Sequence, residues 1–439
     1  MSSPVMELPS ADVIARYEPV IGLEVHVQLA TATKIFCGCP TSFGAPPNTN
    51  VCPVCLGLPG ALPVLCREAV ELAVKAGLAL NCTIRPMSRF ARKNYFYPDL
   101  PKGYQISQYD EPVAEHGEVE IIVDGRSKRI GVTRVHMEDD AGKSIHDGFR
   151  DSDRYSYVDL NRCGTPLIEI VSEPDMRSAD EAHAYLTEIK QTLQFVEVST
   201  CDMEKGHLRC DANVSVRLKG AEKFGTKAEV KNVNSFRFVK LALDYEISRQ
   251  IAALESGGAV KQETRLFNPD TGETVGMRSK EHAHDYRYFP EPDLVPLGVS
   301  DRWLGEIRST MPELPARKRK RFVESYGLRE YDAQVLTSTR AIADYYEKVA
   351  TVSGDPRAAA NWVMGELSGA LHAEGKTIGE SPVSADQLGE LLGLVRKGEI
   401  SNKLAKEIFP KMLASGQPAS AIIEREGLKQ VSDSGALEK

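Results

Sequence analysis

Apolar and polar residues alternate strictly along two segments, residues 21–29 and 208–218. A period of two places the apolar side chains on one face of a β-strand and the polar ones on the other. The polar positions of the two segments are Glu24, His26, Gln28, Arg209, Asp211, Asn213, Ser215 and Arg217. The simplest interpretation is a sheet with one face in water. Because Asp, Asn and Ser are poor strand formers, a polar face that carries chemistry is an equally open interpretation of residues 209–215.

Apolar spacing of three and four residues predicts helices elsewhere in the chain. In the first part these are residues 63–80, a segment that opens at Ser178 with Glu181 in a capping-box pattern, and residues 235–254. From about Leu294 onward the chain is helical in character, with segments at residues 316–326, 339–350, 356–372, 385–397 and 401–414. Strands and helices do not alternate in a βαβ rhythm, which favours an α+β fold with a mostly antiparallel sheet.

The length of 439 residues exceeds what one hydrophobic core usually supports, so we expect more than one domain. Proline is frequent near residues 290–296 and disfavours helix at the preceding residue, which suggests a boundary there. We therefore expect a first domain at residues 1–293, a helical domain at residues 294–398 and a small helical module at residues 399–439.

Composition and charge narrow the class of protein. The hydrophobic content of 42% includes no apolar run near the length of a membrane helix, and residues 1–19 lack the features of a signal peptide. We expect a cytoplasmic protein without a membrane partner. The net charge of −8 argues against binding nucleic acid over the whole surface, although local basic patches stay possible. The densest patch is residues 317–321, either a solvated helix face or a phosphate contact.

Residues 136–144 combine a histidine with carboxylates and a lysine: His136, Glu138, Asp139, Asp140 and Lys143. Carboxylates suit Mg²⁺, which takes oxygen ligands from protein, water and phosphate. An acidic turn in solvent is the competing interpretation. The sequence Gly-Lys-Ser at residues 142–144 is not a P-loop, because Met137 stands where that motif needs glycine. Without a Gly-rich phosphate loop, ATP would have to be held by side chains and sheet geometry.

Four cysteines form two close pairs, Cys37 with Cys39 and Cys52 with Cys55, separated by twelve residues. Four thiolates at this spacing suit tetrahedral Zn²⁺, and closed sites of this kind are structural. We expect zinc in the loop at residues 37–55. Nothing in the sequence resembles an activated serine or cysteine nucleophile.

Two loops are rich in aromatic residues, at residues 94–99 and 285–290. Their tyrosines and phenylalanines are suited to stacking on adenine or on an unpaired terminal base. They are equally suited to anchoring the loops against the core, and the sequence does not decide between the two.

Seven motifs over the first 293 residues closely resemble, in one order, the B subunit of glutamine-dependent aspartyl/glutamyl-tRNA amidotransferases. They are Ile21–Val27 (IGLEVHV), Arg92–Asp99 (RKNYFYPD), Tyr104–Gln108 (YQISQ), His136–Lys143 (HMEDDAGK), Asn161–Leu167 (NRCGTPL), Arg209–Asn213 (RCDAN) and Asp285–Asp293 (DYRYFPEPD). Where this chain has Asp139, the family often has Glu.

The resemblance implies a cradle domain similar to glutamine synthetase catalytic domains, followed by an all-α domain and a short helical tail that is expected to be incomplete. It implies partnership with a glutaminase A subunit and a small C subunit. In that family the B subunit uses ATP to phosphorylate the side-chain carboxylate of Glu-tRNA(Gln) or Asp-tRNA(Asn), and ammonia from the A subunit then displaces phosphate. ATP, Mg²⁺ and a structural Zn²⁺ are the expected cofactors.

Residue roles follow by position in the matching motifs and by strand parity. We expect Mg²⁺ at Glu24, His26, Glu138 and Asp139. We expect phosphate contacts from Lys143, Arg209, Lys227 and Lys231, and further ATP contacts from Tyr97 and Ser107. Orientation of ligand or ammonia is expected from Asp211, Asn213 and Glu229. Strand parity places Asp139 on the side opposite Glu138 unless the strand has already ended.

Two other functions compete with this one. The first is a non-catalytic, zinc-stabilised scaffold that binds tRNA, and the second is a free-standing ligase that acts on a free amino acid. Affinity for ATP in the presence of Mg²⁺ separates an enzyme from the scaffold.

Overall fold

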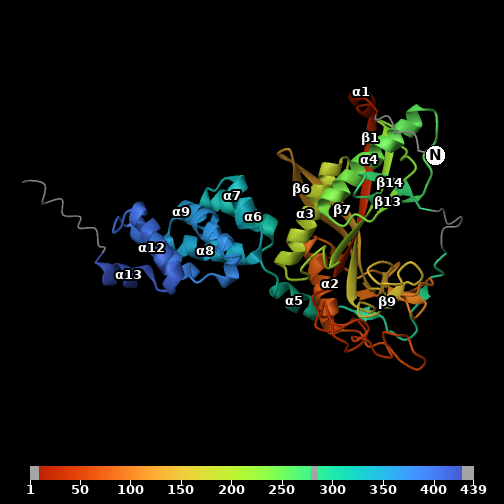
Figure 1. Cartoon of the computed structure of the whole chain (residues 1–439), viewed down its shortest axis with the longest axis horizontal. Helices are drawn as coiled ribbons and strands as arrows, with labels where there is room; N and C mark the ends of the chain where they lie inside the picture. The colour runs from red at the N-terminus through yellow and green to blue at the C-terminus, as the bar shows by residue number, and fades with distance from the viewer. Residues whose placement is uncertain (1–8, 278–284, 428–439) are drawn as a thin grey trace, which may run out of the picture. The chain divides into compact units, whose positions relative to one another are not determined.

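The computed structural model describes residues 9–277 and 285–427. The chain divides into two compact units, Met1–Met311 and Pro312–Lys439. Figure 1 shows the first unit as a sheet covered by helices and the second as a group of helices.

A twelve-stranded sheet forms the centre of the first unit in the described part of the chain. Neighbouring strands run antiparallel except for the parallel pair β12 and β13. The strand order is β14 (Glu273–Gly276), β13 (Thr264–Asn268), β12 (Ala228–Lys231), β11 (Leu208–Leu218), β1 (Tyr17–Gln28), β10 (Pro166–Ser172), β7 (Arg126–Asp139), β5 (Tyr104–Ser107), β4 (Ala91–Asn94) and β15 (Phe289–Pro290), while β6 (Ala114–Val123) pairs with both β7 and β2 (Thr83–Ile84). The predicted mixed α+β class with a mostly antiparallel sheet is confirmed.

Two short ribbons lie outside this sheet. Strand β16 (Leu297–Gly298) pairs with β3 (Met87–Ser88), and β8 (Lys143–Ile145) pairs with β9 (Tyr157–Asp159). The long hairpin of β6 and β7 turns at Asp124 and Gly125, both with positive φ. An Asp-Gly pair supplies the positive φ angles that a type I′ turn requires.

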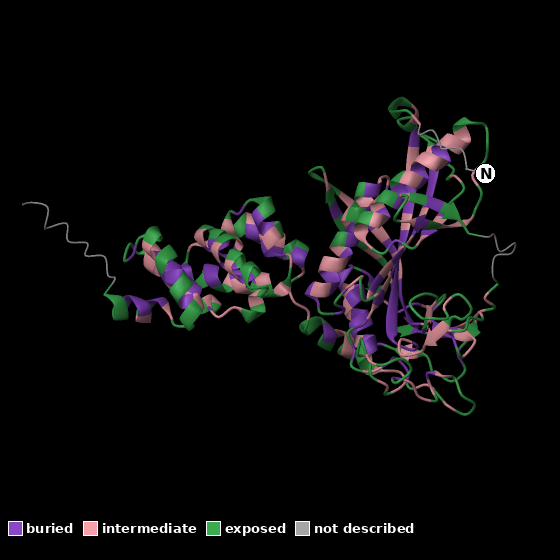
Figure 2. Cartoon of the chain, in the orientation of Figure 1, coloured by how far each residue is buried: buried purple, intermediate pink, exposed green. Residues whose placement is uncertain are grey.

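Burial of alternate residues confirms the two predicted strands. In β1 the side chains of Ile21, Leu23 and Val25 are at most 1% exposed, while Glu24 and His26 on the other face are half-buried. Helices α3 (Ala179–Phe195) and α4 (Phe236–Glu255) pack on the apolar side of the sheet, and α2 (Arg67–Ala79) packs against β7 and β6 (Figure 1). Figure 2 shows the central strands largely coloured as buried. The helices thus cover the apolar face, and the polar side chains of β1 lie on the other face.

Helix starts follow local hydrogen bonds. The Ser178 and Ser235 side chains accept from the backbone N–H groups of Glu181 and Phe238, as N-cap residues do. The predicted start at residue 63 is wrong, because α2 begins at Arg67. The N–H groups of Val64 and Cys66 donate to the carbonyls of Phe36 and Ile35, so residues 64–66 pair with an extended segment instead.

Two short helices complete the first unit, α1 (Ala11–Ile14) and α5 (Asp301–Ser309). In α5 the indole N–H of Trp303 donates to Glu71, and the Arg67 guanidinium lies over the Trp303 ring. These contacts join α5 to α2. Residues 294–311 thus belong to the same compact unit as the sheet.

The second unit is helical, as the spacing from residue 316 onward predicts. Its elements are α6 (Pro315–Tyr326), α7 (Glu330–Leu336), α8 (Arg340–Ser353), α9 (Pro356–Trp362), a π-helical turn (Val363–Leu367), α10 (Ser368–Ala373), a 3₁₀ turn (Ile378–Glu380), α11 (Ala385–Arg396), α12 (Asn402–Ser415) and α13 (Ala419–Glu426). A single buried cluster runs from Phe322 to Ile423, so α12 and α13 share a core with α6–α11. Among the described helices, none has the length and apolar character needed to cross a membrane.

Candidate functional site

Side chains from four neighbouring strands meet on the polar face of the sheet. His26 of β1 lies opposite Arg209 of β11 on one side and Glu169 of β10 on the other, and Glu169 lies opposite His136 of β7. Residues directly across a sheet point to the same face. The register therefore sets these four side chains in one row across the strands.

Glu169 lies between two imidazoles. Its Oε2 atom is 3.4 Å from Nε2 of His26 and 3.3 Å from Nε2 of His136. The Glu138 carboxylate adjoins the same group, with Oε1 at 3.8 Å from Nε2 of His26. Ligand atoms of His26, Glu138 and Glu169 all lie within 4.8 Å of one another. We call His26, His136, Glu138 and Glu169 the carboxylate–histidine cluster.

Burial and mutual charge shift the pKa values of this cluster. Burial raises the pKa of Glu138, and burial together with the charges of Glu169 and Glu229 raises the pKa of Glu24. Burial alone would raise the pKa of Glu169, but hydrogen bonds and charge from His136 and His26 hold it well below its usual range. Several acidic side chains thus share a small volume, where a bound cation would relieve their repulsion.

The donor set fits a divalent cation. Mg²⁺ is usually held through one or two carboxylates together with water and substrate phosphates, and Glu138 and Glu169 supply two carboxylates. The imidazoles hold Glu169 in place between them. Of the predicted ligands, the structure brings Glu138 and His26 together and places Glu24 two residues before His26 on the same face.

A cavity of about 320 Å³ adjoins Glu24 and is lined by residues of β1, β10 and β11. Asn213 lines this cavity and donates to Oε1 of Glu24 at 3.0 Å. Phe224 and Lys227, from the segment between β11 and β12, line it as well. The predicted residues Glu24, Asn213 and Lys227 thus surround one space. Phe224 was not predicted, and it adds an aromatic ring.

Lys231 of β12 is engaged in ion pairs. Its Nζ atom is 2.5 Å from Oδ2 of Asp211 and 3.1 Å from Oε1 of Glu229. Burial lowers the pKa of Lys231, but Asp211 and Glu229 outweigh it and raise the net value. Its positive charge is therefore compensated by two of the residues predicted to orient the ligand.

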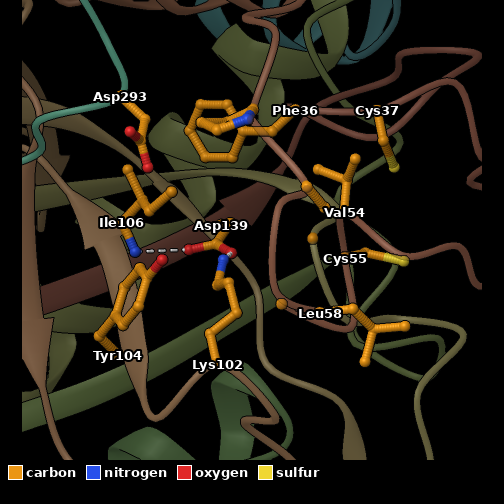
Figure 3. A pocket seen from close by; sticks show the side chains of 14 residues that line it. Phe36, Cys37, Val54, Cys55, Leu58, Lys102, Tyr104, Ile106, Asp139 and Asp293 are labelled. Carbon is orange, nitrogen blue, oxygen red and sulfur yellow. Dashed lines mark hydrogen bonds and ion pairs between the residues drawn. The ribbon is translucent and has the colours of Figure 1, made fainter.

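The acidic run at residues 138–140 divides among different partners. Asp139 points to the opposite side from Glu138, where its carboxylate pairs with Lys102 and accepts from the Ile106 N–H at 2.7 Å (Figure 3). Asp140 accepts from Arg209 at 2.8 Å, which accounts for the inward position of that arginine. Strand β7 extends through Asp139, so parity holds to its end. Glu169 occupies the place in the cluster that the sequence analysis gave to Asp139.

A second cavity, of about 120 Å³, lies beside the Lys102–Asp139 pair. Cys37, Val54 and Cys55 of the cysteine loop and the flanking Phe36 and Leu58 line its other side (Figure 3). Burial lowers the pKa of Lys102, but the Asp139 carboxylate outweighs it and raises the net value. The ion pair thus links β7 to the turn that precedes β5, and both of its residues line the cavity that the cysteine loop borders.

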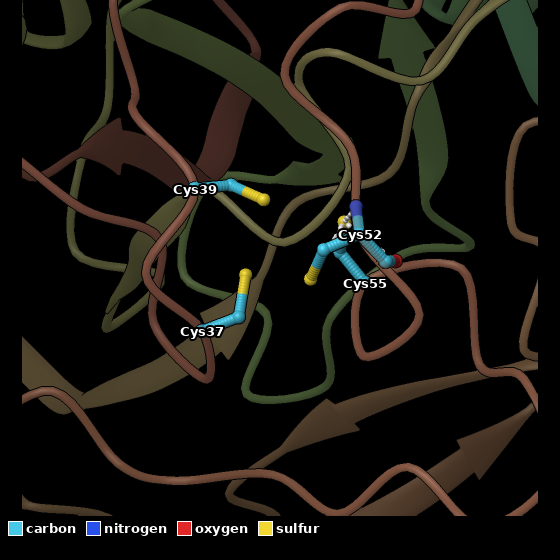
Figure 4. A group of neighbouring side chains, drawn as sticks. All are labelled: Cys37, Cys39, Cys52 and Cys55. Atoms are coloured by element: carbon cyan, nitrogen blue, oxygen red, sulfur yellow. Dashed lines mark hydrogen bonds between the residues drawn. The ribbon is translucent and has the colours of Figure 1, made fainter.

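The four paired cysteines converge as their spacing predicts (Figure 4). All of their sulfur atoms lie within 4.8 Å of one another, and those of Cys52 and Cys55 are 3.9 Å apart. Zn–S bonds of about 2.3 Å in a tetrahedron separate the sulfurs by about 3.8 Å, so the arrangement fits a structural metal. A hydrogen bond from Cys37, aided by the Cys52 N–H and the Lys34 charge, lowers the pKa of Cys55 to about 4 against the effect of burial.

Lys34 is a fully buried lysine beside this group. Its Nζ atom donates to the Asn50 carbonyl at 2.6 Å and to the Cys55 sulfur at 3.6 Å. A positive charge next to a set of thiolates stabilises them as metal ligands. Lys34 was not predicted from the sequence.

Other predicted residues lie apart from the cluster or at its border. Lys143 is exposed on the separate β8–β9 ribbon, where it pairs with Asp159 across the strands. Tyr97 is 50% exposed in the loop after β4. Ser107 is buried on β5 opposite Glu138, and its hydroxyl lies 3.5 Å from Oε2 of that residue.

The basic run at residues 317–321 lies on α6, and part of its charge is neutralised. Lys318 is buried against Asp344 and Glu347, and Arg321 pairs with Glu313 and Glu347. Those two side chains stabilise the helical unit. Arg317 and Lys320 are exposed, and Nζ of Lys320 lies 3.8 Å from Oε1 of Glu324.

Sequence patterns missed Glu169, Lys102 and Lys34. A signal existed for Glu169, since it is the one acidic residue within the apolar strand Pro166–Ser172. Lys102 stands between Pro101 and Gly103, which is typical of an exposed turn. Only the tertiary contacts show that it is buried.

Comparison with known proteins agrees with these features. The sequence profile of the GatB/GatE catalytic domain matches residues 19–305, and that of the GatB domain matches residues 344–439. The B subunit of the aspartyl/glutamyl-tRNA(Asn/Gln) amidotransferase of Geotalea daltonii is 58% identical over 423 residues, 96% of this chain and 88% of its own. The protein of the same name from Syntrophotalea carbinolica is 59% identical over 424 residues, 97% and 88% of the two chains. With the catalytic-domain profile covering more than half of its length, the chain belongs to the GatB family.

Proposed function

We propose that this chain is the subunit of a tRNA-dependent amidotransferase that activates a side-chain carboxylate with ATP and converts it to an amide. The substrate is Glu-tRNA(Gln), Asp-tRNA(Asn) or both, and the ammonia comes from a glutaminase partner. The observation that carries the proposal is the carboxylate–histidine cluster on the polar face of the sheet, in a chain of the GatB family.

The cluster supports phosphoryl transfer because this chemistry needs positioning and charge neutralisation more than a protein nucleophile. Glu138, Glu169 and His26 would hold Mg²⁺, with Glu24 beside them. The bound ion would neutralise charge on the phosphates of ATP. We assign Glu169 to the role that the sequence analysis gave to Asp139, because Lys102 already neutralises Asp139 on the other side of β7.

We assign ATP to the cavity beside Glu24. Its volume of about 320 Å³ lies within the size of small-ligand sites, and it combines the Phe224 ring with the Lys227 ammonium and the Asn213 amide. An aromatic ring suits adenine, and a lysine suits phosphate. Arg209 lies opposite His26 and is bonded to Asp140, and it is proposed as a further phosphate contact.

The proposed chemistry has two steps. A carboxylate oxygen of the substrate attacks the γ-phosphorus of ATP, and the bond from that phosphorus to the bridging oxygen breaks. The products are ADP and an acyl phosphate on the substrate. The nitrogen of ammonia then attacks the acyl carbon, the carbon–oxygen bond to phosphate breaks, and the released proton leaves with inorganic phosphate. Asp211 lies two positions along β11 from Arg209, and Glu229 of β12 lies opposite Asn213. Both are proposed to orient the ligand or ammonia.

We further propose a glutaminase A subunit and a small C subunit as partners, Zn²⁺ as the metal of the cysteine loop, and the cytoplasm as the compartment. The first part, residues 1–293, is proposed to resemble the cradle of glutamine synthetases. The large antiparallel sheet supports the first assignment. The parts expected to be helical, residues 294–398 and 399–439, are proposed to hold tRNA, and the helical unit of the structure begins at Pro312.

The test reconstitutes the chain with A and C subunits, ATP, glutamine, and Glu-tRNA(Gln) or Asp-tRNA(Asn), and measures the amide product. We expect amide formation that requires both ATP and Mg²⁺. Glutamine hydrolysis without amide formation, together with no Mg²⁺-dependent ATP affinity of this chain, would contradict the proposal and favour the scaffold.

A further inference from the structure

The two aromatic loops of the sequence come together in the structure. Tyr95 contacts Tyr286 with ring centres 6.0 Å apart, and Tyr286 contacts Tyr288 at 6.1 Å. Tyr288 in turn stacks on Tyr109, with centres 4.1 Å apart and planes inclined by 13°. These four side chains, which we call the tyrosine cluster, form one continuous aromatic surface from segments far apart in the chain.

The tyrosine cluster borders the carboxylate–histidine cluster. Ser107 of β5 pairs with Glu138 of β7, and the N–H of Gln108 donates to the Met137 carbonyl at 3.1 Å, so pairing continues beyond β5. Tyr109 follows two residues after Ser107, in the bend beyond β5. Tyr288 lies close enough to Glu138 that, after burial, the charge of this carboxylate raises its pKa.

Exposure separates a supporting part from an open part. Tyr95, Tyr286 and Tyr288 are half-buried, whereas Tyr109 is 54% exposed although one face of its ring is covered by Tyr288. Lys93 adds a positive charge, with Nζ 4.8 Å from the centre of the Tyr286 ring. A supported aromatic ring beside a cation is the usual platform for an unpaired base and its phosphate.

The position of the tyrosine cluster favours the end of an RNA, and not ATP, as its ligand. The cavity with Phe224 and Lys227 is lined by β1, β10 and β11 at the Glu24 end of the cluster, whereas Tyr109 and Tyr95 of the tyrosine cluster follow the ends of β5 and β4, on the other side of β7. The proposed reaction joins two substrates that each carry an adenine nucleotide, namely ATP and an aminoacylated RNA. The cavity has the size of a small-ligand site, and the exposed ring of Tyr109 suits a terminal nucleotide that stays attached to a large molecule.

We propose that Tyr109, supported by Tyr288, stacks on the unpaired 3′-terminal adenine of the RNA substrate and so brings its esterified amino acid to the carboxylate–histidine cluster. This inference rests on the proposed function, because the choice of RNA follows from it. An adenine from ATP is the other source of the same chemistry, and the test below distinguishes the two.

The test uses the full chain and two RNA stem-loops that carry no amino acid. They differ only in the 3′ end, which is CCA in one and CC in the other. Binding is measured by fluorescence anisotropy, and Mg²⁺-ATP binding is measured by calorimetry. The variants are Tyr109→Ala, Tyr109→Phe and the control Tyr155→Ala, whose tyrosine is similarly exposed at 56% outside the cluster. Melting followed by circular dichroism verifies that each variant is folded.

The expected wild-type preference for the CCA end is about 5- to 150-fold, which corresponds to about 1–3 kcal/mol of base stacking. Tyr109→Ala should remove this preference and leave ATP affinity unchanged, whereas Tyr109→Phe and Tyr155→Ala should keep both. Equal wild-type affinity for the two RNAs, a preserved preference in Tyr109→Ala, or weaker ATP binding in that variant would each overturn the proposal. A wild-type preference without amide formation in the assembled complex would instead contradict the proposed function alone.

Discussion

Replacing Asp139 by Asn tests whether this residue belongs to an ion pair or to the metal site. The Lys102 and Asp139 side chains are 6% and 0% exposed, so Asp139→Asn leaves an ammonium group buried without its counter-charge. Breaking a buried pair from one side costs about 3–5 kcal/mol, whereas replacing both partners is often neutral. The side-chain carbonyl of the introduced asparagine keeps an acceptor for the Ile106 N–H. We therefore expect Asp139→Asn to lower the free energy of unfolding by about 3–5 kcal/mol. The double variant Lys102→Met/Asp139→Asn should regain much of that free energy.

The chain offers a convenient probe for this measurement. It has two tryptophans, Trp303 in the first unit and Trp362 in the second. In a Trp362→Phe background, Trp303 fluorescence reports unfolding of the first unit alone, because its ring is packed against Arg67 and bonded to Glu71. Urea unfolding of the single and double variants gives the coupling free energy between Lys102 and Asp139.

The effect of Mg²⁺ on stability distinguishes the two possible roles of Asp139, as partner of Lys102 or as metal ligand. A ligand that binds only the folded state raises its stability, so a metal ligand can be recognised by loss of that increment. We expect Asp139→Asn to keep the stabilisation by Mg²⁺-ATP. A cost below about 1 kcal/mol in the absence of Mg²⁺, combined with loss of that stabilisation, would refute the ion-pair assignment and return Asp139 to the metal site.

Three further predictions concern the cluster, the cysteine loop and acid stability. Glu169→Gln should abolish amide formation in the assembled complex while glutamine hydrolysis continues. Near-normal amidation would exclude Glu169 as a Mg²⁺ ligand. The control is Glu118→Gln, which changes an exposed carboxylate of the same sheet. Lys34→Met should weaken zinc binding about 10- to 100-fold in chelator competition, and the exposed Lys223→Met should not; equal affinities would show that the Lys34 charge is immaterial. Burial opposes ionisation of Glu246, but hydrogen bonds from Arg249 and Gln250 lower its net pKa. This carboxylate therefore stabilises the fold above its unfolded pKa of about 4.3 and loses that effect as pH falls. In Glu246→Gln the free energy of unfolding should decline less steeply below about pH 5 than in the wild type. Equal slopes of unfolding free energy against pH in the two proteins would contradict this assignment.

The sequence by itself determined the local structure and much of its chemistry. Period-two alternation identified β1 and β11 and the face on which Glu24 and His26 lie, because side-chain direction in a strand depends only on residue parity. Capping serines marked the starts of α3 and α4. The close pairs of cysteines predicted a four-thiol site, since short loops leave little freedom in where their ends can meet.

The tertiary structure alone decided which of these pieces meet. Strand β1 lies between β10 and β11, and β10 lies between β1 and β7. This order places Glu169 between His26 and His136. Strands β1 and β10 are separated by more than a hundred residues of chain. Asp139 is turned to Lys102 because β7 stays paired to its last residue, and Lys143 leaves the site because its segment joins a separate ribbon. Periodicity records the direction of a side chain within its own strand, but register between distant strands is set by the packing of the whole sheet, and no local pattern contains it.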